Sequence, residues 1–191
     1  MTDASPCASA PGVGPPWPDW YHLDNVFPSR RRMDRAHRPI VALACRTLRG
    51  VGGNVLDLGC GNGALLRKIH ALEPRVTPFG IERDPLRVAH ARLLLPAFAG
   101  NLFEGDLFGA HPLRETGQRF ALALLTPRRL SEAGQGGAAR LRDWIRERCE
   151  RLLIYGYGRS RREFGNLAGF ARRVGVEVEE SATHAGLALR W

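Results

Sequence analysis

The residues best suited to chemistry surround a turn in which every second residue is glycine. Asp57 lies near the end of a short apolar run, Gly59, Gly61 and Gly63 form the turn, and an Ala-Leu-Leu sequence opens the next segment. This order predicts a strand, a tight turn and a helix N-terminus. The glycines permit a close approach by another molecule, and the helix start suits a carboxylate or phosphate. A buried carboxylate at Asp57 needs a ligand or a backbone donor.

Two further acids follow predicted strands. Glu82 comes after residues 76–81, and its carboxylate can accept hydrogen bonds from both hydroxyls of a ribose. The alternative is a surface acid, and we expect Glu82 on a rim, where its removal would change the stability little. Asp106 follows a short strand at 101–104, where it either contacts a ligand or forms an Asx turn.

The whole stretch from Asp57 to Gly63 resembles the first motif of the class I S-adenosylmethionine (SAM) methyltransferases. A looser match, on Gly59, Gly61 and Ala64, is to the dinucleotide-binding pattern. The methyltransferase resemblance implies SAM as the cofactor, an acid at Glu82 for the ribose, and Asp106 with the N–H of Leu107 for the adenine. The cofactor-binding residues that it implies are Asp57, Gly59, Cys60, Gly61, Asn62, Gly63, Glu82, Arg83, Asp106, Leu107 and Thr126.

The strand predicted at 120–125 ends in a Thr-Pro-Arg-Arg sequence. Many amino-group methyltransferases have Asp or Asn and then Pro-Pro at this strand end, so Thr126 departs from the family pattern. Thr126 still places a hydroxyl at the mouth of the site, and Arg128 and Arg129 either hold an acidic substrate or face solvent. The candidate catalytic residues are Tyr21, His22 and Thr126; Tyr155 and His184 are further candidates for a general base.

Predicted strands and helices alternate along the chain, which indicates an α/β fold with a parallel sheet and helices on both faces. The resemblance implies a doubly wound, seven-stranded sheet in the order 3-2-1-4-5-7-6. Residues 1–18 are expected to be a disordered tail, 19–50 a lid or helical segment, and 51–191 the SAM-binding domain. We expect helices that begin at Pro39 and Pro85 and helices over 63–72, around 141–149 and over 161–174. The helix from Pro85 carries Leu86, Ala89, His90, Leu93 and Leu94 on one side, and a loop at 131–137 precedes the helix around 141–149. Further strands are expected at 151–157, 176–180 and 185–191.

Two N-terminal segments have alternative interpretations. The aromatic cluster between Trp17 and Phe27 either packs onto the domain or forms a lid over the cofactor and substrate. The basic run from Ser29 to Arg38 is either a solvated helical face or a substrate contact.

The composition limits the class of protein. The four cysteines are scattered without a C-x-x-C pair, which favours reduced thiols in a cytoplasmic protein and argues against a zinc site. No signal peptide or membrane span is recognisable. The net charge of +9 comes almost entirely from arginine, and Lys68 is the single lysine. A polyanionic partner and the GC-rich codons of arginine, alanine, glycine and proline explain this charge equally well.

These observations predict SAM-dependent methyl transfer to an O or N atom of a small molecule, such as a natural product or peptide-like metabolite. We expect a monomer or homodimer that does not bind a membrane. The alternatives are an RNA methyltransferase, a non-catalytic SAM-binding module and an NAD(P)-dependent oxidoreductase. The oxidoreductase is disfavoured because Gly63 comes one position earlier than the last glycine of the dinucleotide-binding pattern. It is also disfavoured because no catalytic Tyr-x-x-x-Lys sequence is present.

Overall fold

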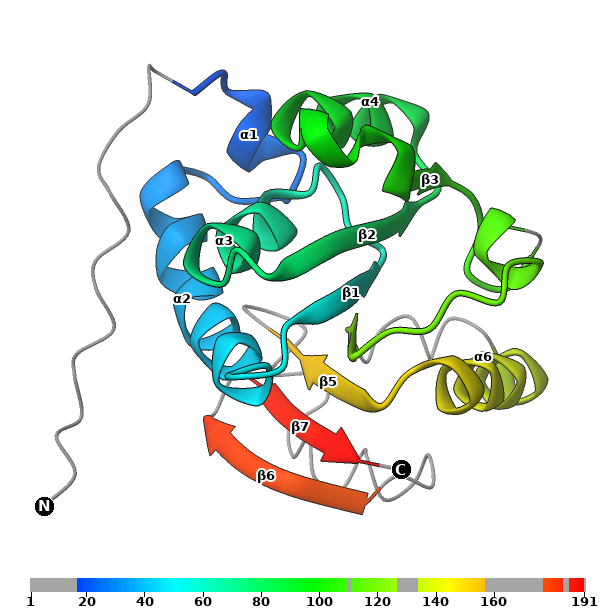
Figure 1. The fold of residues 1–191 in the computed structure, drawn as a ribbon. Coiled ribbons are helices and arrows are strands. Elements are labelled where there is room, and N and C mark those ends of the chain that lie inside the picture. The colour runs from blue at the N-terminus through cyan, green and yellow to red at the C-terminus, as the bar shows by residue number, and fades with distance from the viewer. Residues whose placement is uncertain (1–16, 110, 127–133, 157–176, 184–185, 191) are drawn as a thin grey trace, which may run out of the picture.

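The computed structural model describes residues 17–109, 111–126, 134–156, 177–183 and 186–190 (Figure 1). Its strands are β1 (Gly53–Leu58), β2 (Val76–Glu82), β3 (Leu102–Glu104), β4 (Leu122–Leu125), β5 (Arg151–Tyr155), β6 (Glu177–Thr183) and β7 (Gly186–Arg190). Its helices are α1 (Trp20–Leu23), α2 (Arg30–Thr47), α3 (Ala64–Leu72), α4 (Pro85–Leu94) and α6 (Gly134–Arg148), with 3-10 helices η1 (Pro96–Asn101) and η2 (Pro112–Arg114). The predictions for residues 1–16, Arg128, Arg129, the 161–174 helix and His184 lie outside the described residues.

Five strands pair in parallel in the order β3-β2-β1-β4-β5, which confirms the predicted α/β fold. Residues Leu122–Leu125 of β4 are all buried, as a central strand covered on both faces requires. Beyond β5, strand β7 pairs antiparallel with β5, and β6 pairs antiparallel with β7. The carboxyl ends of the five parallel strands therefore meet at one rim.

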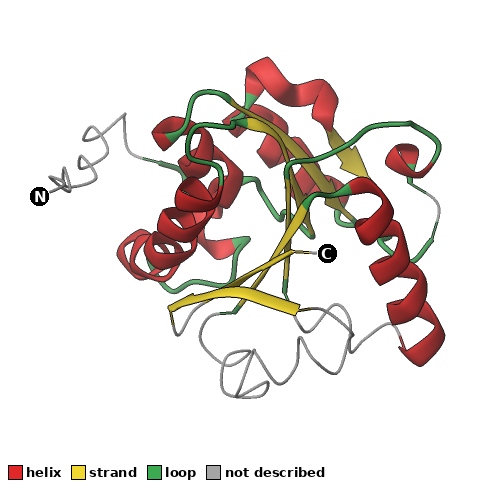
Figure 2. Cartoon of the chain, turned by 60° about the horizontal axis from the view of Figure 1, so that its bottom comes forward, coloured by secondary structure: helices red, strands yellow, loops and turns green. Residues whose placement is uncertain are grey.

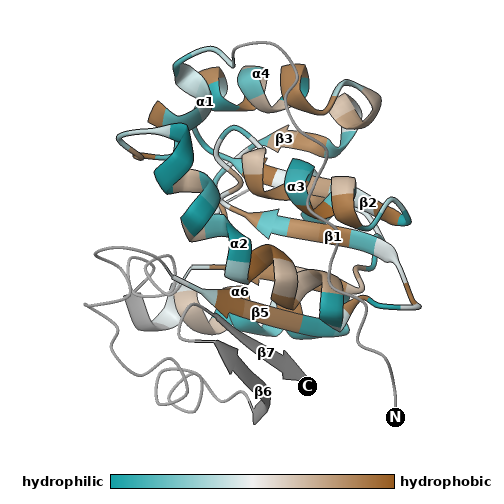
Figure 3. Ribbon diagram, turned by 90° about the vertical axis from the view of Figure 1, so that its left-hand side faces the viewer, coloured by the Kyte–Doolittle hydropathy of each residue, from teal (hydrophilic) through white to brown (hydrophobic). Residues whose placement is uncertain are grey.

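Alternate residues of the five parallel strands contribute to two separate cores, one on each face of the sheet. Leu56 and Leu58 of β1 pack with Ile145 of α6, whereas Val55 packs with residues of α2, α3 and α4. Figure 2 shows helices on both sides of the sheet, and Figure 3 shows the apolar character of β1 and β2 between them. This two-sided burial holds the strand ends in fixed positions.

Helix α2 is longer than the sequence predicts. Ser29 accepts the N–H of Arg32 at 3.3 Å as the N-cap, so the basic run is helical and Pro39 lies inside the helix rather than at its start. A proline there removes one backbone hydrogen bond. The apolar face on both sides of it, including Met33, Ile40 and Leu43, is buried against the domain, and this burial holds the helix together across the proline.

Helix α4 begins as predicted, with Asp84 as its N-cap and Pro85 in its first turn. Its buried face matches the expected one only at Leu94. Val88, Ala91 and Leu94 face the core, whereas Leu86 and Leu93 are 61% and 69% exposed. Apolar residues stand on more than one side of this helix, so the spacing alone does not identify the buried face.

Helix α6 begins at Gly134, inside the stretch predicted as a loop. No helix in the described ranges has both the length and the apolarity needed to cross a membrane.

Candidate functional site

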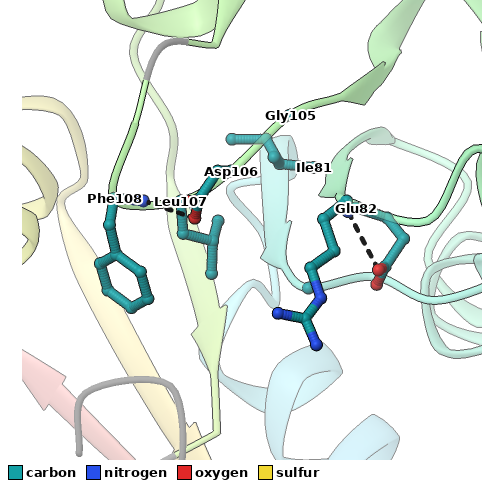
Figure 4. Close-up of a pocket in the computed structure, with 8 residues that line it drawn as sticks. Ile81, Glu82, Gly105, Asp106, Leu107 and Phe108 are labelled. Atoms are coloured by element: carbon teal, nitrogen blue, oxygen red, sulfur yellow. Dashed lines mark hydrogen bonds between the residues drawn. The ribbon is translucent and has the colours of Figure 1, made fainter. Parts of the chain in front are cut away.

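A pocket of about 300 Å³ opens at the carboxyl ends of β1, β2 and β3. It is lined by Gly59, Ile81, Glu82, Arg83, Gly105, Asp106, Leu107 and Phe108. Figure 4 shows Glu82 on one wall and the Asp106 to Phe108 loop on the other. The parallel sheet thus brings the glycine turn and both predicted acids to one place, as expected for a ligand site in an open α/β sheet.

The glycine turn is fixed to the end of β2 by backbone hydrogen bonds. The N–H groups of Gly59 and Cys60 both donate to the carbonyl of Ile81, at 2.9 and 3.0 Å. Gly61 has φ +55°, and a Cβ there would lie 2.6 Å from Oδ1 of Asn25. Glycine is therefore required at 61 for both its conformation and its contact.

Glu82 is nearly inaccessible, with 3% of its surface exposed. Its Oε2 accepts the N–H of Gly61 at 3.0 Å, and its Oε1 accepts the N–H groups of Arg83 and Asp84 at 3.0 and 3.2 Å. Glu82 lies on the rim, as expected, but the alternative of a surface acid is wrong, and these bonds argue against the expectation that its removal changes the stability little. Three backbone donors depend on this carboxylate, and it closes the loop between β2 and α4.

Asp106 is exposed at the opposite wall of the pocket. Its Oδ1 accepts the N–H of Phe108 at 3.1 Å, which confirms the Asx-turn interpretation. The next residue, Leu107, is buried, and its carbonyl accepts a hydrogen bond from Arg114 Nη2 at 3.0 Å. The turn holds the Asp106 carboxylate at the pocket's edge, and a ligand contact there is compatible with it.

Asp57 lies below the pocket, 1% exposed, and does not line it. The hydroxyl of Tyr155, at the end of β5, donates to Asp57 Oδ1 across 3.5 Å. Tyr155 is itself buried, so the structure places it beneath the strand ends as a partner of Asp57.

The side chains of Cys60 and Asn62 point away from the pocket. Cys60 fills the space over Gly80, where a Cβ would lie 2.6 Å from Sγ, and burial raises the pKa of its thiol well above the usual range. Asn62 is fully buried, and its Nδ2 donates to the carbonyls of Trp20 and Tyr21 at 3.1 and 3.0 Å. These side chains serve packing, so the prediction that Cys60 and Asn62 bind the cofactor now concerns their backbone groups and stays a prediction.

The side-chain oxygen of Asn62 also forms hydrogen bonds, one of them to the N-terminal segment. Oδ1 of Asn62 accepts Nδ2 of Asn25 at 2.6 Å and the N–H of Ala64 at 3.2 Å. The amide thus fixes the start of α3 and holds the loop after α1 against the glycine turn.

The three candidate catalytic residues do not line the pocket. Tyr21 is 2% exposed and stacks on Trp17 with ring centroids 4.8 Å apart, and burial raises the pKa of its phenol. His22 is half-buried in α1, where its carbonyl accepts the N–H of Phe27 at 3.0 Å. Thr126 is half-buried directly after β4. The buried, protonated phenol of Tyr21 is a poor general base at this position.

Sequence reasoning missed four residues at or beside the site. Ile81, Gly105 and Phe108 line the pocket, and Asn25 touches the glycine turn. The first three stand next to recognised residues in the chain, so their adjacency was a usable signal. Asn25 carries no such signal, because its partner lies 37 residues away.

Comparison of the sequence with family models and with curated proteins finds no match. Comparison of the structure finds solved methyltransferases. The pyocyanin biosynthetic protein PhzM has a TM-score of 0.59 at 19% identity, over 91% of this chain and 62% of that one. An O-methyltransferase family protein of Burkholderia thailandensis has a TM-score of 0.58 at 19% identity, over 84% of this chain and 57% of that one. The present chain therefore spans less than two thirds of either protein.

A third solved structure is matched over most of its length. The magnesium protoporphyrin IX methyltransferase ChlM of Synechocystis PCC 6803, determined with bound SAM, has a TM-score of 0.54 at 14% identity, over 93% of this chain and 87% of that one. Together with the parallel sheet and the glycine turn, these likenesses confirm the family resemblance at the level of fold: the chain has the Rossmann-like fold of the class I SAM-dependent methyltransferases.

Proposed function

We propose that this protein is a SAM-dependent methyltransferase. The observation that carries the proposal is the meeting of Gly59, Glu82 and Asp106 in one pocket. A carboxylate on each wall provides acceptors for the ribose hydroxyls and the adenine amino group of an adenosine. Solved structures of this fold with bound SAM or S-adenosylhomocysteine support the choice of cofactor.

Each residue has a defined part in this proposal. The backbone from Gly59 to Gly63 receives the methionine portion at the start of α3, where the helix N-terminus favours a carboxylate. Asp106 and the N–H of Leu107 face the adenine. Arg83 lines the same pocket and places a cation beside the adenosine.

The hydrogen bonds of Glu82 limit how it can hold a ribose. A carboxylate has about four acceptor positions. Two on Oε1 and one on Oε2 accept backbone N–H groups, so one position on Oε2 remains. Glu82 therefore accepts one ribose hydroxyl directly, and a second bond requires the N–H of Gly61 to move away. This revises the expectation of two simultaneous hydroxyl bonds.

Bound SAM supplies a methyl group that its sulfonium has already activated. The protein's task is then to hold the acceptor in line, and such alignment contributes roughly 7–11 kcal/mol to lowering a barrier. Of the three candidate catalytic residues, we retain Thr126, because Leu125 before it pairs with Leu58 at the entrance to the glycine turn. A general base is needed only for an acceptor that keeps its proton at neutral pH.

The proposed acceptor is an O or N atom of a small molecule. Support comes from fold neighbours whose names include the mitomycin 7-O-methyltransferase MmcR and ChlM. The second candidate acceptor is RNA, and the basic face of α2 is the observation that favours it.

The proposal includes the complete sheet order 3-2-1-4-5-7-6, which the pairing of β5 with β7 and of β7 with β6 supports. It also keeps residues 51–191 as the SAM-binding domain and 19–50 as a helical segment. We propose that residues 19–50 cover the glycine turn, because the side chain of Asn25 lies against Gly61 there.

Isothermal titration calorimetry tests the cofactor. SAM and S-adenosylhomocysteine should bind, whereas NAD and NADP should not bind comparably. Asp106→Ala should weaken SAM binding at least about tenfold, since a hydrogen bond to a charged group contributes about 1.5–3 kcal/mol and 1.4 kcal/mol is a factor of ten. Asp143→Ala, an exposed aspartate on α6, is the matched control and should bind as the wild type does. Tight NAD binding without SAM binding would overturn the proposal.

A further inference from the structure

The pocket wall that carries Asp106 is held from behind by an arginine. Arg114, in η2, donates from Nη2 to the carbonyl oxygen of Leu107 at 3.0 Å. The N–H of the same peptide group belongs to Phe108 and donates to Oδ1 of Asp106 at 3.1 Å (Figure 4). This one peptide group therefore joins the two side chains, with a cation at its oxygen and a carboxylate at its nitrogen.

The joined peptide group orients the carboxylate. A positive charge beside a carbonyl oxygen polarises the peptide, so its N–H becomes a stronger donor. The N–H of Phe108 holds Oδ1 of Asp106, whereas Oδ2 has no hydrogen bond or ion pair among the residues that the structure describes. Asp106 is exposed and lines the pocket, so one carboxylate oxygen is fixed and the other is left for a ligand.

Arg114 is itself held in place by packing. Its guanidinium group lies 6.0 Å from the ring centroid of Trp144 on α6. Trp144 is buried and meets the ring of His111 edge to face, with centroids 5.1 Å apart. Leu113, next to Arg114 in the chain, is buried in the same core as Trp144. The planar guanidinium on this platform therefore loses little further freedom when it binds the carbonyl.

The charge that acts on this peptide group is that of Arg114. In the described ranges no ion pair involves Arg114 or Asp106. Burial and the charge of Arg114 lower the pKa of His111 to about 4, although Asp106 acts in the opposite direction. His111 is therefore neutral at pH 7 and adds no second charge behind the wall.

Arg92 makes a similar hydrogen bond without this consequence. Its Nε and Nη2 donate to the carbonyl of Leu102 at 3.2 and 2.8 Å. Leu102 is the first residue of β3, and neither residue lines the pocket. A bond from an arginine to a carbonyl is therefore not in itself a feature of the site. What distinguishes Arg114 from Arg92 is that its peptide group also holds a carboxylate of the pocket.

We propose that Arg114 is a positioning residue, which sets the carboxylate of Asp106 to accept the amino group of adenine and so makes the pocket prefer adenine to bases without that group. This role rests on the proposed function, in which Asp106 faces the adenine. Hypoxanthine has an oxygen in place of the amino group, and an oxygen cannot donate to a carboxylate. A carboxylate that is loosely held would lose much of this discrimination.

Calorimetry with S-adenosylhomocysteine and with S-inosylhomocysteine, its hypoxanthine analogue, tests the preference. The wild type should bind the adenine compound at least about tenfold more tightly, as expected for a hydrogen bond to a charged group. Arg114→Met keeps an aliphatic side chain over Trp144 but removes the charge and the donors, and it should bind the two compounds within about threefold of each other. Arg92→Met is the matched control and should keep the wild-type ratio. Arg114→Lys retains a cation that can donate to a carbonyl and should recover part of the preference.

A double variant separates positioning from a general loss of structure. If Arg114 acts through Asp106, adding Arg114→Met to Asp106→Ala should leave the ratio of the two affinities as it is in Asp106→Ala alone. A purely structural role would weaken both compounds together, so a wild-type ratio in Arg114→Met would overturn the inference. A further change of the ratio in the double variant would overturn it too, and so would a loss of preference in Arg92→Met.

Hydrogen exchange of the ligand-free protein, followed by NMR, tests the same link without a cofactor. The amide of Phe108 should exchange at least about tenfold faster in Arg114→Met than in the wild type, because its peptide group loses the bond that fixes it. In Arg92→Met it should exchange at the wild-type rate. Equal rates in Arg114→Met and the wild type would overturn the inference.

The two measurements fail in distinguishable ways. If the wild type binds neither compound, the proposed function falls, and the exchange rate of Phe108 alone decides whether Arg114 holds the wall. Arg114→Gln removes the same charge with a polar side chain, and it replaces Arg114→Met in both measurements if that variant does not fold.

Discussion

The backbone N–H of Gly61 donates to the carboxylate of Glu82 at 3.0 Å. This bond joins the centre of the glycine turn to the end of the neighbouring strand. The ribose acceptor that the sequence predicts is thus also part of the framework that shapes the cofactor's turn. Affinity and stability are coupled through this one side chain.

Replacing Glu82 with alanine should therefore lower both quantities. Three backbone N–H groups lose their acceptor, and the free energy of unfolding should fall by at least about 2 kcal/mol, given about 1–3 kcal/mol for each unsatisfied buried group. Urea unfolding followed by circular dichroism measures this loss. Glu104→Ala is the control, since that glutamate lies beside Glu82 in the β2–β3 register and is exposed. Wild-type stability in Glu82→Ala would refute the structural part assigned to this carboxylate.

Asn62→Ala should destabilise the attachment of the N-terminal segment. The substitution removes the donors to the carbonyls of Trp20 and Tyr21 and the acceptor for the N–H of Ala64. A loss of at least about 2 kcal/mol in the free energy of unfolding follows. Tryptophan fluorescence should report it, because Trp17 and Trp20 lie in the segment. Asn101→Ala, at a half-buried asparagine of η1, should unfold as the wild type does.

The stability should decrease in acid because of His37. Burial and the ammonium of Lys68 lower the pKa of His37 to about 3, against an ordinary value of 6.5. As the pH falls below about 6.5, His37 becomes protonated in the unfolded chain but stays neutral in the folded protein, so folding becomes less favourable. Between pH 7 and pH 5 this amounts to about 2 kcal/mol.

His37→Leu removes this contribution, so its free energy of unfolding should fall by about 2 kcal/mol less than that of the wild type over the same interval. Urea unfolding at pH 7, 6 and 5 gives both slopes, and the comparison does not depend on the absolute stability of the variant. If the free energy of unfolding of the wild type and of His37→Leu falls equally between pH 7 and pH 5, then His37 takes up its proton in the folded protein and the prediction is wrong.

Val26→Gly should stabilise the protein. Val26 has φ +60°, a region that a β-branched residue rarely adopts, and it is 82% exposed, so little packing is lost with its side chain. Relief of strain of about 1–2 kcal/mol outweighs the entropy that a glycine adds to the unfolded chain, for a net gain of about 0.5–1 kcal/mol. Leu23→Gly, at an exposed position within α1, should instead lose stability. A rise in the melting temperature for Val26→Gly alone is the expected result.

The elements and residues that the sequence predicts well are those with local signals. The glycine turn, the uniform apolar run of β4 and the Asp84-Pro85 start of α4 are each recognisable within a few residues. The parallel sheet follows from the alternation of such elements, and it brings Glu82 and Asp106 to one rim.

The features that the sequence did not predict depend on partners far along the chain. The polar groups of Asn62 bond to residues about 40 positions earlier, and Glu82 is buried because the turn at Gly61 lies over it. Pro39 is tolerated within α2 because the helix has a domain to pack against. Apolar residues occur on more than one side of α4, and the elements packed against the helix determine which of them are buried. None of these outcomes is visible in a short window of sequence.

The bond between Asn25 and Asn62 also has a consequence for synthesis of the chain. The ribosome makes Asn62 37 residues after Asn25, which at about 5–20 residues per second is a delay of roughly 2–7 s. During that interval Trp17, Trp20 and Tyr21 have neither the amide of Asn62 nor the first turn of α3 to dock on. The newly made N-terminal region therefore presents an aromatic surface to chaperones, or to other nascent chains, until the glycine turn has emerged.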